Sequence, residues 1–140
     1  LAEGAPKNSK IVTIEIDDEM VSFIKKYFQE SEYGHKIELI VGDAVKLMHN
    51  YEDDFFDLIF IDGNKRDYCA YYDIAFNKLR NGGVILADNT LWNGKVIDEK
   101  YQEDSQTKGV LKFNNLIKED TRIEKVILPI RDGLTIIHKK

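Results

Sequence analysis

Phe55-Phe56-Asp57-Leu58-Ile59-Phe60-Ile61-Asp62-Gly63-Asn64-Lys65 is the stretch that decides the fold. Its apolar run ends in a carboxylate at Asp62 and breaks on glycine, and Lys65 follows three residues beyond the acid. The run is too short to span a membrane, so it predicts a buried strand with Asp62 and Lys65 at its tip. The pattern returns in Gly83-Val84-Ile85-Leu86-Ala87-Asp88-Asn89. Two strand tips that carry oxygen ligands predict one shared site.

Strands and helices alternate on both sides of this stretch. The order is strand then helix, four times, followed by two strands around the tight turn Arg131-Asp132-Gly133. This order predicts an α/β fold with a mostly parallel sheet, helices on both faces and a C-terminal antiparallel hairpin. Pro129 favours an edge position for the first hairpin strand, because an edge tolerates a missing N–H donor. The expected strands cover residues 10–17, 37–41, 55–62, 83–88, 123–130 and 134–139.

The helix limits and one long loop are also predicted from local residue types. The first helix follows a cap at Asp17 or Asp18 and is expected to end at Gly34. A later helix covers residues 67–79 and is expected to close at Asn81-Gly82-Gly83. Residues 90–108 are polar with little periodicity, so we predict a long loop over the strand tips.

Composition narrows the class of protein. The 140 residues suit one domain spanning residues 1–140, and 43% hydrophobic with 32% charged residues is ordinary globular composition. The net charge of −5 argues against a broad nucleic-acid-binding surface, which would need an excess of lysine and arginine. The single cysteine, Cys69, forms no internal disulfide, and no leader or long apolar stretch stands out. A soluble, cytoplasmic protein with no membrane partner is therefore expected.

Four acidic residues fall at the expected ends of four strands: Glu15, Asp43, Asp62 and Asp88. Ligands of open α/β sheets bind at the carboxyl ends of the strands, so the four together predict a binding site there. Any one of them has a second interpretation, because an acid in this position also caps the helix that follows.

Asp62, Asp88 and Asn89 offer only oxygen ligands. This set suits a hard cation such as Mg²⁺ or Ca²⁺ and does not suit zinc, which prefers thiolate and imidazole. Lys65 is placed to pair with Asp62 or to meet a substrate hydroxyl, although a surface lysine is an equal alternative. Trp92, in the loop after Asn89, is interpreted as a substrate wall in preference to ordinary core.

Glu15 is placed to bind a nucleotide cofactor. It closes a strand at the position where Rossmann-like folds use an acid to accept hydrogen bonds from a ribose diol. Both NAD and S-adenosylmethionine carry such a ribose, so Glu15 alone does not separate them. No G-x-G-x-x-G and no P-loop occurs in the 140 residues.

Five segments together resemble the cation-dependent O-methyltransferases, the family of the caffeoyl-CoA and catechol enzymes and their bacterial relatives. The match runs in order over nearly the whole chain, and the Asp-Asn-x-Leu-Trp-x-Gly block is its most specific element. The segments are Ile14-Glu15-Ile16-Asp17, Val41-Gly42-Asp43-Ala44, Phe60-Ile61-Asp62-Gly63-Asn64-Lys65 with Tyr68, Asp88-Asn89-Thr90-Leu91-Trp92-Asn93-Gly94 and Leu128-Pro129-Ile130-Arg131-Asp132-Gly133-Leu134.

The resemblance implies a Rossmann-like class I methyltransferase sheet with S-adenosylmethionine at the strand tips. It also implies a metal-chelated, catechol-like phenolic substrate, which would be methylated on one hydroxyl, and a homodimer for the full-length protein. By the same resemblance, Glu15 binds the ribose, Asp43 and Ala44 the adenine, and Tyr68 lies near the methionine part; Asp62, beside the cofactor and the substrate, joins Asp88 and Asn89 in holding Mg²⁺, Ca²⁺ or Mn²⁺, and Lys65 is the base.

The sequence departs from this family in identified places. Gly63 stands where relatives usually have Ala or His, and Asn64 where they often have Asp. Family members carry substrate-contacting helices, a first strand and a Gly-rich turn ahead of the segment that Leu1-Ala2-Glu3-Gly4 resembles. We therefore expect an N-terminally incomplete chain, the C-terminal two-thirds of the fold, with a gap beside the strand bearing Glu15 and inactive by itself. A non-catalytic binding module is the alternative function, and an NAD-dependent oxidoreductase is less favoured.

Overall fold

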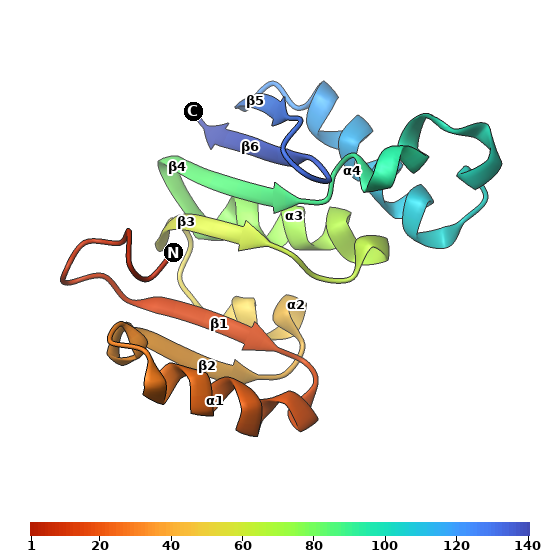
Figure 1. Cartoon of the computed structure of the whole chain (residues 1–140). Coiled ribbons are helices and arrows are strands. Elements are labelled where there is room, and N and C mark those ends of the chain that lie inside the picture. The colour runs from red at the N-terminus through yellow and green to blue at the C-terminus, as the bar shows by residue number, and fades with distance from the viewer. The chain divides into compact units, whose positions relative to one another are not determined.

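The structure, a computed structural model, describes residues 1–140 as two compact units. Unit 1 comprises Leu1–Leu47 and unit 2 comprises Met48–Lys140. Strands and helices alternate along the chain as predicted, and the last two strands form a hairpin (Figure 1). None of the helices combines the length and the apolar character that a membrane crossing requires.

Unit 1 is built on two parallel strands. β1 (Ile11–Glu15) pairs with β2 (Ile37–Val41), and Glu15 lies opposite Val41 at their carboxyl ends. The connection contains the short helix η1 (Asp18–Met20), helix α1 (Val21–Glu30) and the short helix η2 (Gly34–Lys36). Asp17 caps this connection by accepting the Glu19 N–H at 3.0 Å, as the sequence predicted.

The expected end of α1 at Gly34 is wrong. The helix ends at Glu30, and Ser31 takes an extended conformation with φ −87° and ψ 132°. Gly34 lies in η2 instead, where a Cβ atom would stand 1.7 Å from the carbonyl oxygen of Phe28. Glycine is therefore required here for close packing against the end of α1, not as the helix terminator.

Unit 2 contains a four-stranded mixed sheet in the order β3-β4-β6-β5. β3 (Phe56–Ile61) and β4 (Leu79–Asp88) are parallel, whereas β6 (Leu134–Lys139) is antiparallel to both β4 and β5 (Ile123–Leu128). The predicted hairpin and the edge position of its first strand are confirmed. Pro129 follows β5 directly, so it removes no hydrogen bond from the ladder.

Helices pack on this sheet and enclose an apolar core. The short helix η3 (Met48–Asn50) follows α2 (Ala44–Leu47) at the start of unit 2. The short helix η4 (Lys65–Asp67) leads into α3 (Tyr68–Lys78), which packs on β3 and β4, and α4 (Ser105–Glu119) packs on α3 and β5. The core residues, all below a tenth exposed, are Ile61, Tyr68, Tyr72, Ala75, Phe76, Leu79, Ile85, Ala87, Phe113, Ile117, Ile123 and Ile137.

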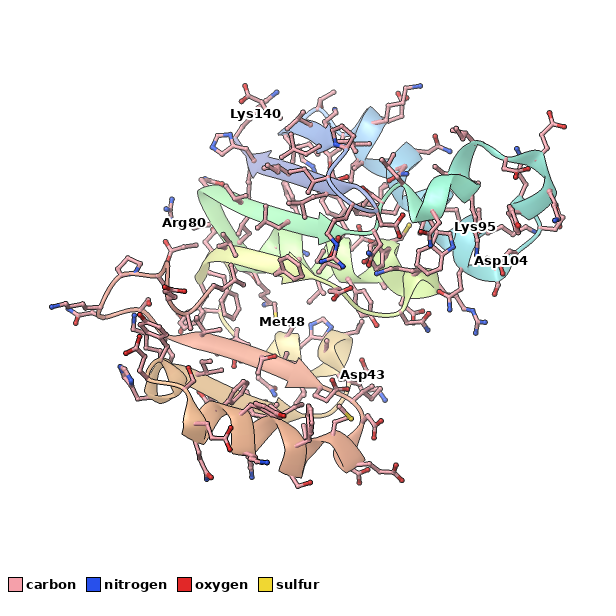
Figure 2. All side chains as sticks on the ribbon, viewed as in Figure 1. Asp43, Met48, Arg80, Lys95, Asp104 and Lys140 are labelled. Atoms are coloured by element: carbon pink, nitrogen blue, oxygen red, sulfur yellow. The ribbon has the colours of Figure 1, made fainter.

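Two predicted limits in unit 2 are wrong. α3 ends at Lys78, and residues 81–83 lie inside β4, which begins at Leu79. The expected loop at residues 90–108 contains the short helices η5 (Trp92–Ile97) and η6 (Glu99–Tyr101) and the first turn of α4. That first turn is polar and has no apolar period; Asp104 caps it by accepting the Thr107 N–H at 2.8 Å (Figure 2).

β1 and β3 belong to different sheets. β1 pairs only with β2, and β3 pairs only with β4, so each has one side without a strand partner. This agrees with the predicted gap beside the strand that carries Glu15.

Candidate active site

The four acidic residues lie at strand ends, as predicted. In unit 1, Glu15 is the last residue of β1 and Asp43 follows β2 by two residues. Their carboxylates also bind local backbone: Glu15 Oε1 accepts the Asp17 N–H at 2.9 Å, and Asp43 Oδ1 accepts the Val45 N–H at 3.0 Å. The capping interpretation therefore holds for Asp43, and Ala44 begins the helix that it caps (Figure 2). One oxygen of each carboxylate accepts none of these backbone bonds.

The acids of unit 2 converge on one hollow. Asp62 follows β3, and Asp88 is the last residue of the adjacent strand β4, with Asn89 next to it. All three line an open hollow of about 650 Å³. The parallel pairing of β3 and β4 brings them together, since Ile61 lies opposite Ala87 and both chains leave the sheet at the same edge. The other residues that line the hollow are Asn93, Arg131 and Asp132.

Asn89 takes a strained backbone conformation at the tip of β4. Its φ is 57°, in the left-handed region that is costly for residues other than glycine. Asp88 Oδ1 accepts the Asn89 N–H at 2.7 Å, which stabilises this turn. Asn89 lines the same hollow as Asp88, and backbone strain of this kind concentrates at functional sites.

Lys65 is enclosed beside the hollow. It is 6% exposed, and its Nζ lies 3.2 Å from Asp62 Oδ1 and 2.5 Å from the hydroxyl oxygen of Tyr68. The same ammonium lies 4.6 Å from the ring centroid of Tyr68 and 5.8 Å from that of Trp92. The alternative of a solvated surface lysine is excluded. The carboxylate of Asp62, the hydroxyl of Tyr68 and the faces of the two aromatic rings take the place of the water that an exposed lysine would bind.

Tyr68 connects Lys65 to the backbone of β4. Its side chain is fully buried, and its hydroxyl donates to the Asp88 carbonyl at 2.8 Å while accepting from Lys65. Burial raises the pKa of the Tyr68 hydroxyl well above its usual value, and the nearby charges of Asp62 and Asp88 raise it further. Tyr68 therefore remains a neutral hydroxyl that fixes the ammonium relative to the strand tip.

A glycine on α4 allows that helix to pack against the backbone that carries Lys65. A Cβ atom at Gly109 would lie 2.2 Å from the carbonyl oxygen of Lys65 and 2.7 Å from the Arg66 Cα. Helix α4 thus packs directly on the backbone of η4, and only glycine permits this approach.

The loop after β4 is joined to the β5–β6 turn by backbone hydrogen bonds. The Thr90 N–H donates to the Gly133 carbonyl at 3.0 Å, and the Leu91 N–H donates to the Asp132 carbonyl at 2.9 Å. The Asn93 N–H donates to the Asp132 carboxylate. Gly133 has φ 85° and lies so close to Leu91 that a Cβ atom would stand 2.5 Å from that side chain. The hairpin turn and the loop therefore form one wall of the hollow.

The residues present fit a hard divalent cation. Two carboxylates and one amide offer oxygen donors to one hollow, which is the donor chemistry of Mg²⁺ or Mn²⁺ sites that keep several water ligands. No cluster of three or more His, Cys, Asp and Glu side chains is placed to hold a metal.

Sequence reasoning missed several residues of this site. Arg131, Asp132 and Asn93 line the hollow, and Gly109 supports Lys65 from α4. The tight turn was visible in the sequence, but its contact with the loop after β4 depends on the β4–β6 pairing. Trp92 lies near Lys65 but does not line the hollow, and its enclosed Nε1–H has no hydrogen-bond partner.

Comparisons with known proteins agree on one family. The family model described as "O-methyltransferase" matches residues 1–140. The protein named "Probable caffeoyl-CoA O-methyltransferase 3" of Dictyostelium discoideum is 32% identical over 156 residues, which cover 99% of this chain and 62% of that protein. The catechol O-methyltransferase of Niastella koreensis is 29% identical over 131 residues, covering 91% of this chain and 59% of its own length. The chain therefore spans less than two thirds of these relatives.

A solved structure has the same fold. The O-methyltransferase of Bacillus cereus, in a complex with SAH, superposes with a TM-score of 0.89 at 26% sequence identity. The match covers 100% of this chain and 67% of the Bacillus chain.

Proposed function

The chain belongs to the O-methyltransferase family, and from this membership we propose that the whole protein transfers a methyl group to one hydroxyl of a metal-chelated, catechol-like small molecule. The observation that carries the proposal is the convergence of Asp62, Asp88 and Asn89 on one hollow beside the enclosed Lys65.

The hollow has the donors for a divalent ion and room for a small aromatic molecule. In this proposal Asp62, Asp88 and Asn89 hold Mg²⁺, or Ca²⁺ or Mn²⁺ in its place. A divalent cation held by them would favour ionisation of a catechol hydroxyl and fix its direction. β3 and β4 are adjacent parallel strands, so they place these side chains at the same edge of the sheet.

Lys65 is the residue we assign to the proton of the reacting hydroxyl. Its ammonium has two fixed partners, Asp62 Oδ1 and the Tyr68 hydroxyl, which leave part of its donor capacity for the acceptor oxygen. As the ammonium, Lys65 offsets the negative charge that develops on the oxygen; as the neutral amine, it would accept the departing proton. Asp62 would then act both as a cation ligand and as the orienting partner of Lys65.

The ribose and adenine of the cofactor are assigned to the strand tips of unit 1. S-adenosylmethionine would supply the methyl group, with S-adenosylhomocysteine as the co-product. In unit 1 Glu15 would accept hydrogen bonds from its ribose, and Asp43 with Ala44 would contact its adenine; Glu15 keeps one carboxylate oxygen outside its bond to Asp17. The predicted place of Tyr68 beside the methionine part remains a prediction. Its enclosed side chain supports Lys65 in the structure.

A methyl-transfer assay tests the proposal. The whole protein is incubated with S-adenosylmethionine carrying a labelled methyl group and with a panel of catechols, in Mg²⁺ or in EDTA. We expect a labelled monomethyl ether in Mg²⁺ only, and Asp62→Ala should abolish it. Asp67→Ala is the matched control, because Asp67 is exposed and its side chain caps nothing. Full activity in EDTA, or in the Asp62→Ala variant, would contradict the proposed mechanism.

The same assay tests the expectation that residues 1–140 are inactive by themselves. β1 and β3 each have one side without a strand partner, and such an edge is able to pair with a further strand. Methyl transfer by these residues alone, at the rate of the whole protein, would contradict that expectation.

A further inference from the structure

One cationic side chain lines the hollow at the strand tips and has no bonding partner in the protein. Arg131 lines it together with the carboxylates of Asp62, Asp88 and Asp132. The Arg131 side chain makes no hydrogen bond and no ion pair, although other arginines of the chain, such as Arg122 on Asp120, are paired. Arg131 is exposed, so its guanidinium is open to solvent and its N–H donors are free to bind another group.

The backbone at Arg131 is held in an uncommon conformation. Its φ of 52° lies in the left-handed region, which glycine adopts at lower cost than arginine. The turn around it is fixed by the Gly133 N–H, which donates to the Ile130 carbonyl at 3.0 Å, and by the contacts of Asp132 with Leu91 and Asn93. An arginine therefore takes a position that would suit glycine, on a turn anchored to the wall of the hollow, and the strain is offset by local bonds.

We propose that Arg131 binds a carboxylate substituent of the acceptor molecule and thereby selects anionic catechols, such as dihydroxybenzoates, over neutral ones. The inference rests on the proposed function, because it takes the hydroxyl end of the acceptor to lie at Asp62, Asp88 and Asn89. The guanidinium fork matches a carboxylate with two parallel N–H···O bonds, which gives direction as well as affinity.

The charges of the hollow favour this assignment over a passive surface arginine. A divalent cation held by Asp62 and Asp88 would offset their charges, but the carboxylate of Asp132 would still repel an anionic ligand. An acceptor's carboxylate is therefore favoured at the part of the hollow where a protein cation lies. Lys65 already has Asp62 and Tyr68 as partners, and its remaining donor capacity is assigned to the reacting hydroxyl oxygen. Arg131 is the cation of the hollow's lining that has no partner of its own.

The test compares two acceptors that differ by one carboxylate. Binding of 3,4-dihydroxybenzoate and of catechol to the whole protein is measured by isothermal titration in excess Mg²⁺, and methyl transfer to each is measured separately. Arg131→Gln removes the charge but keeps the backbone cost, Arg131→Gly relieves that cost, and Arg131→Lys keeps the charge. Arg80→Gln is the matched control, since Arg80 lies at the other end of β4 and pairs with Asp57.

We expect Arg131→Gln and Arg131→Gly to weaken binding of 3,4-dihydroxybenzoate relative to catechol by roughly tenfold or more, with partial retention in Arg131→Lys. Arg80→Gln should leave the ratio of the two affinities as it is in the wild type. Equal weakening for both acceptors, or an unchanged ratio, would overturn the inference. A changed ratio without methyl transfer would instead leave the carboxylate site standing and refute the proposed reaction.

Discussion

The ammonium nitrogen of Lys65 lies 2.5 Å from the hydroxyl oxygen of Tyr68, and that hydroxyl in turn donates to the backbone carbonyl of Asp88. The contact joins the tip of β3 to the tip of β4 through two enclosed side chains. It thereby fixes the distance between the Lys65 ammonium and the carboxylates of Asp62 and Asp88.

Tyr68→Phe is expected to lower the stability of the fold and also to misplace Lys65. The change removes one acceptor from Lys65 and one donor from the Asp88 carbonyl, and it leaves the buried ring in place. Loss of hydrogen bonds to a buried charged group costs about 1–3 kcal/mol, so urea unfolding should show a loss in that range. We also expect kcat to fall more than KM rises, because a misplaced Lys65 harms the reacting complex most.

Tyr72→Phe is the matched control for that change. Tyr72 lies on the same helix and is equally buried, and its hydroxyl donates to Asp120 at 2.9 Å. Its loss should reduce stability without a specific fall in kcat. If the two variants lose kcat equally, Tyr68 has no positioning role.

Gly109→Ala is expected to destabilise unit 2, against the usual effect of alanine in a helix. Alanine normally gains about 1 kcal/mol over glycine in a helix interior. At Gly109 the new Cβ would stand 2.2 Å from the Lys65 carbonyl oxygen, and backbone does not move aside as a flexible side chain does. Overpacking of this kind costs about 1–3 kcal/mol. Thermal unfolding checks the sign, with Asn115→Ala on an exposed position of α4 as the control; a stabilised Gly109→Ala protein would contradict the close packing.

Several features of the fold and site follow from sequence patterns alone. The strand tips at Asp62 and Asp88 were predictable because an apolar run that ends in an acid and a glycine is a local signal. The position of Arg131 in the hollow was not, because it depends on the pairing of β4 with β6 across many residues of sequence. The end of α1 and the start of α4 were misjudged for a related reason: tertiary packing at Gly34 and a polar first turn after Asp104 override the local signals.

The decline of the unfolding free energy at acidic pH is expected to depend on Asp120. Hydrogen bonds from Arg122 and from Tyr72 hold the pKa of the Asp120 carboxyl well below its usual range. A carboxyl with a lowered folded-state pKa contributes stability above its unfolded value of about 3.9, and that contribution is lost as the pH falls toward the folded-state pKa. Asp120→Asn should therefore flatten the decline of the unfolding free energy below about pH 4.

Urea unfolding between neutral and strongly acidic pH checks this dependence. Glu52→Gln, at an exposed loop position, serves as the control, and its unfolding free energy should decline at acidic pH as in the wild type. A decline of equal steepness in Asp120→Asn and wild type would show that the Arg122 pair does not contribute to acid sensitivity.

Binding of Mn²⁺ to the whole protein, measured by electron paramagnetic resonance, tests the central claim most directly. The account predicts one Mn²⁺ bound in the wild type and in Asp67→Asn, a loss of at least about tenfold in affinity in Asp62→Asn and in Asp88→Asn, and a changed spectrum when a catechol is added. Mn²⁺ binding that is absent from the wild type, or equally strong in Asp62→Asn and Asp88→Asn, would contradict the claim that these strand tips hold the cation.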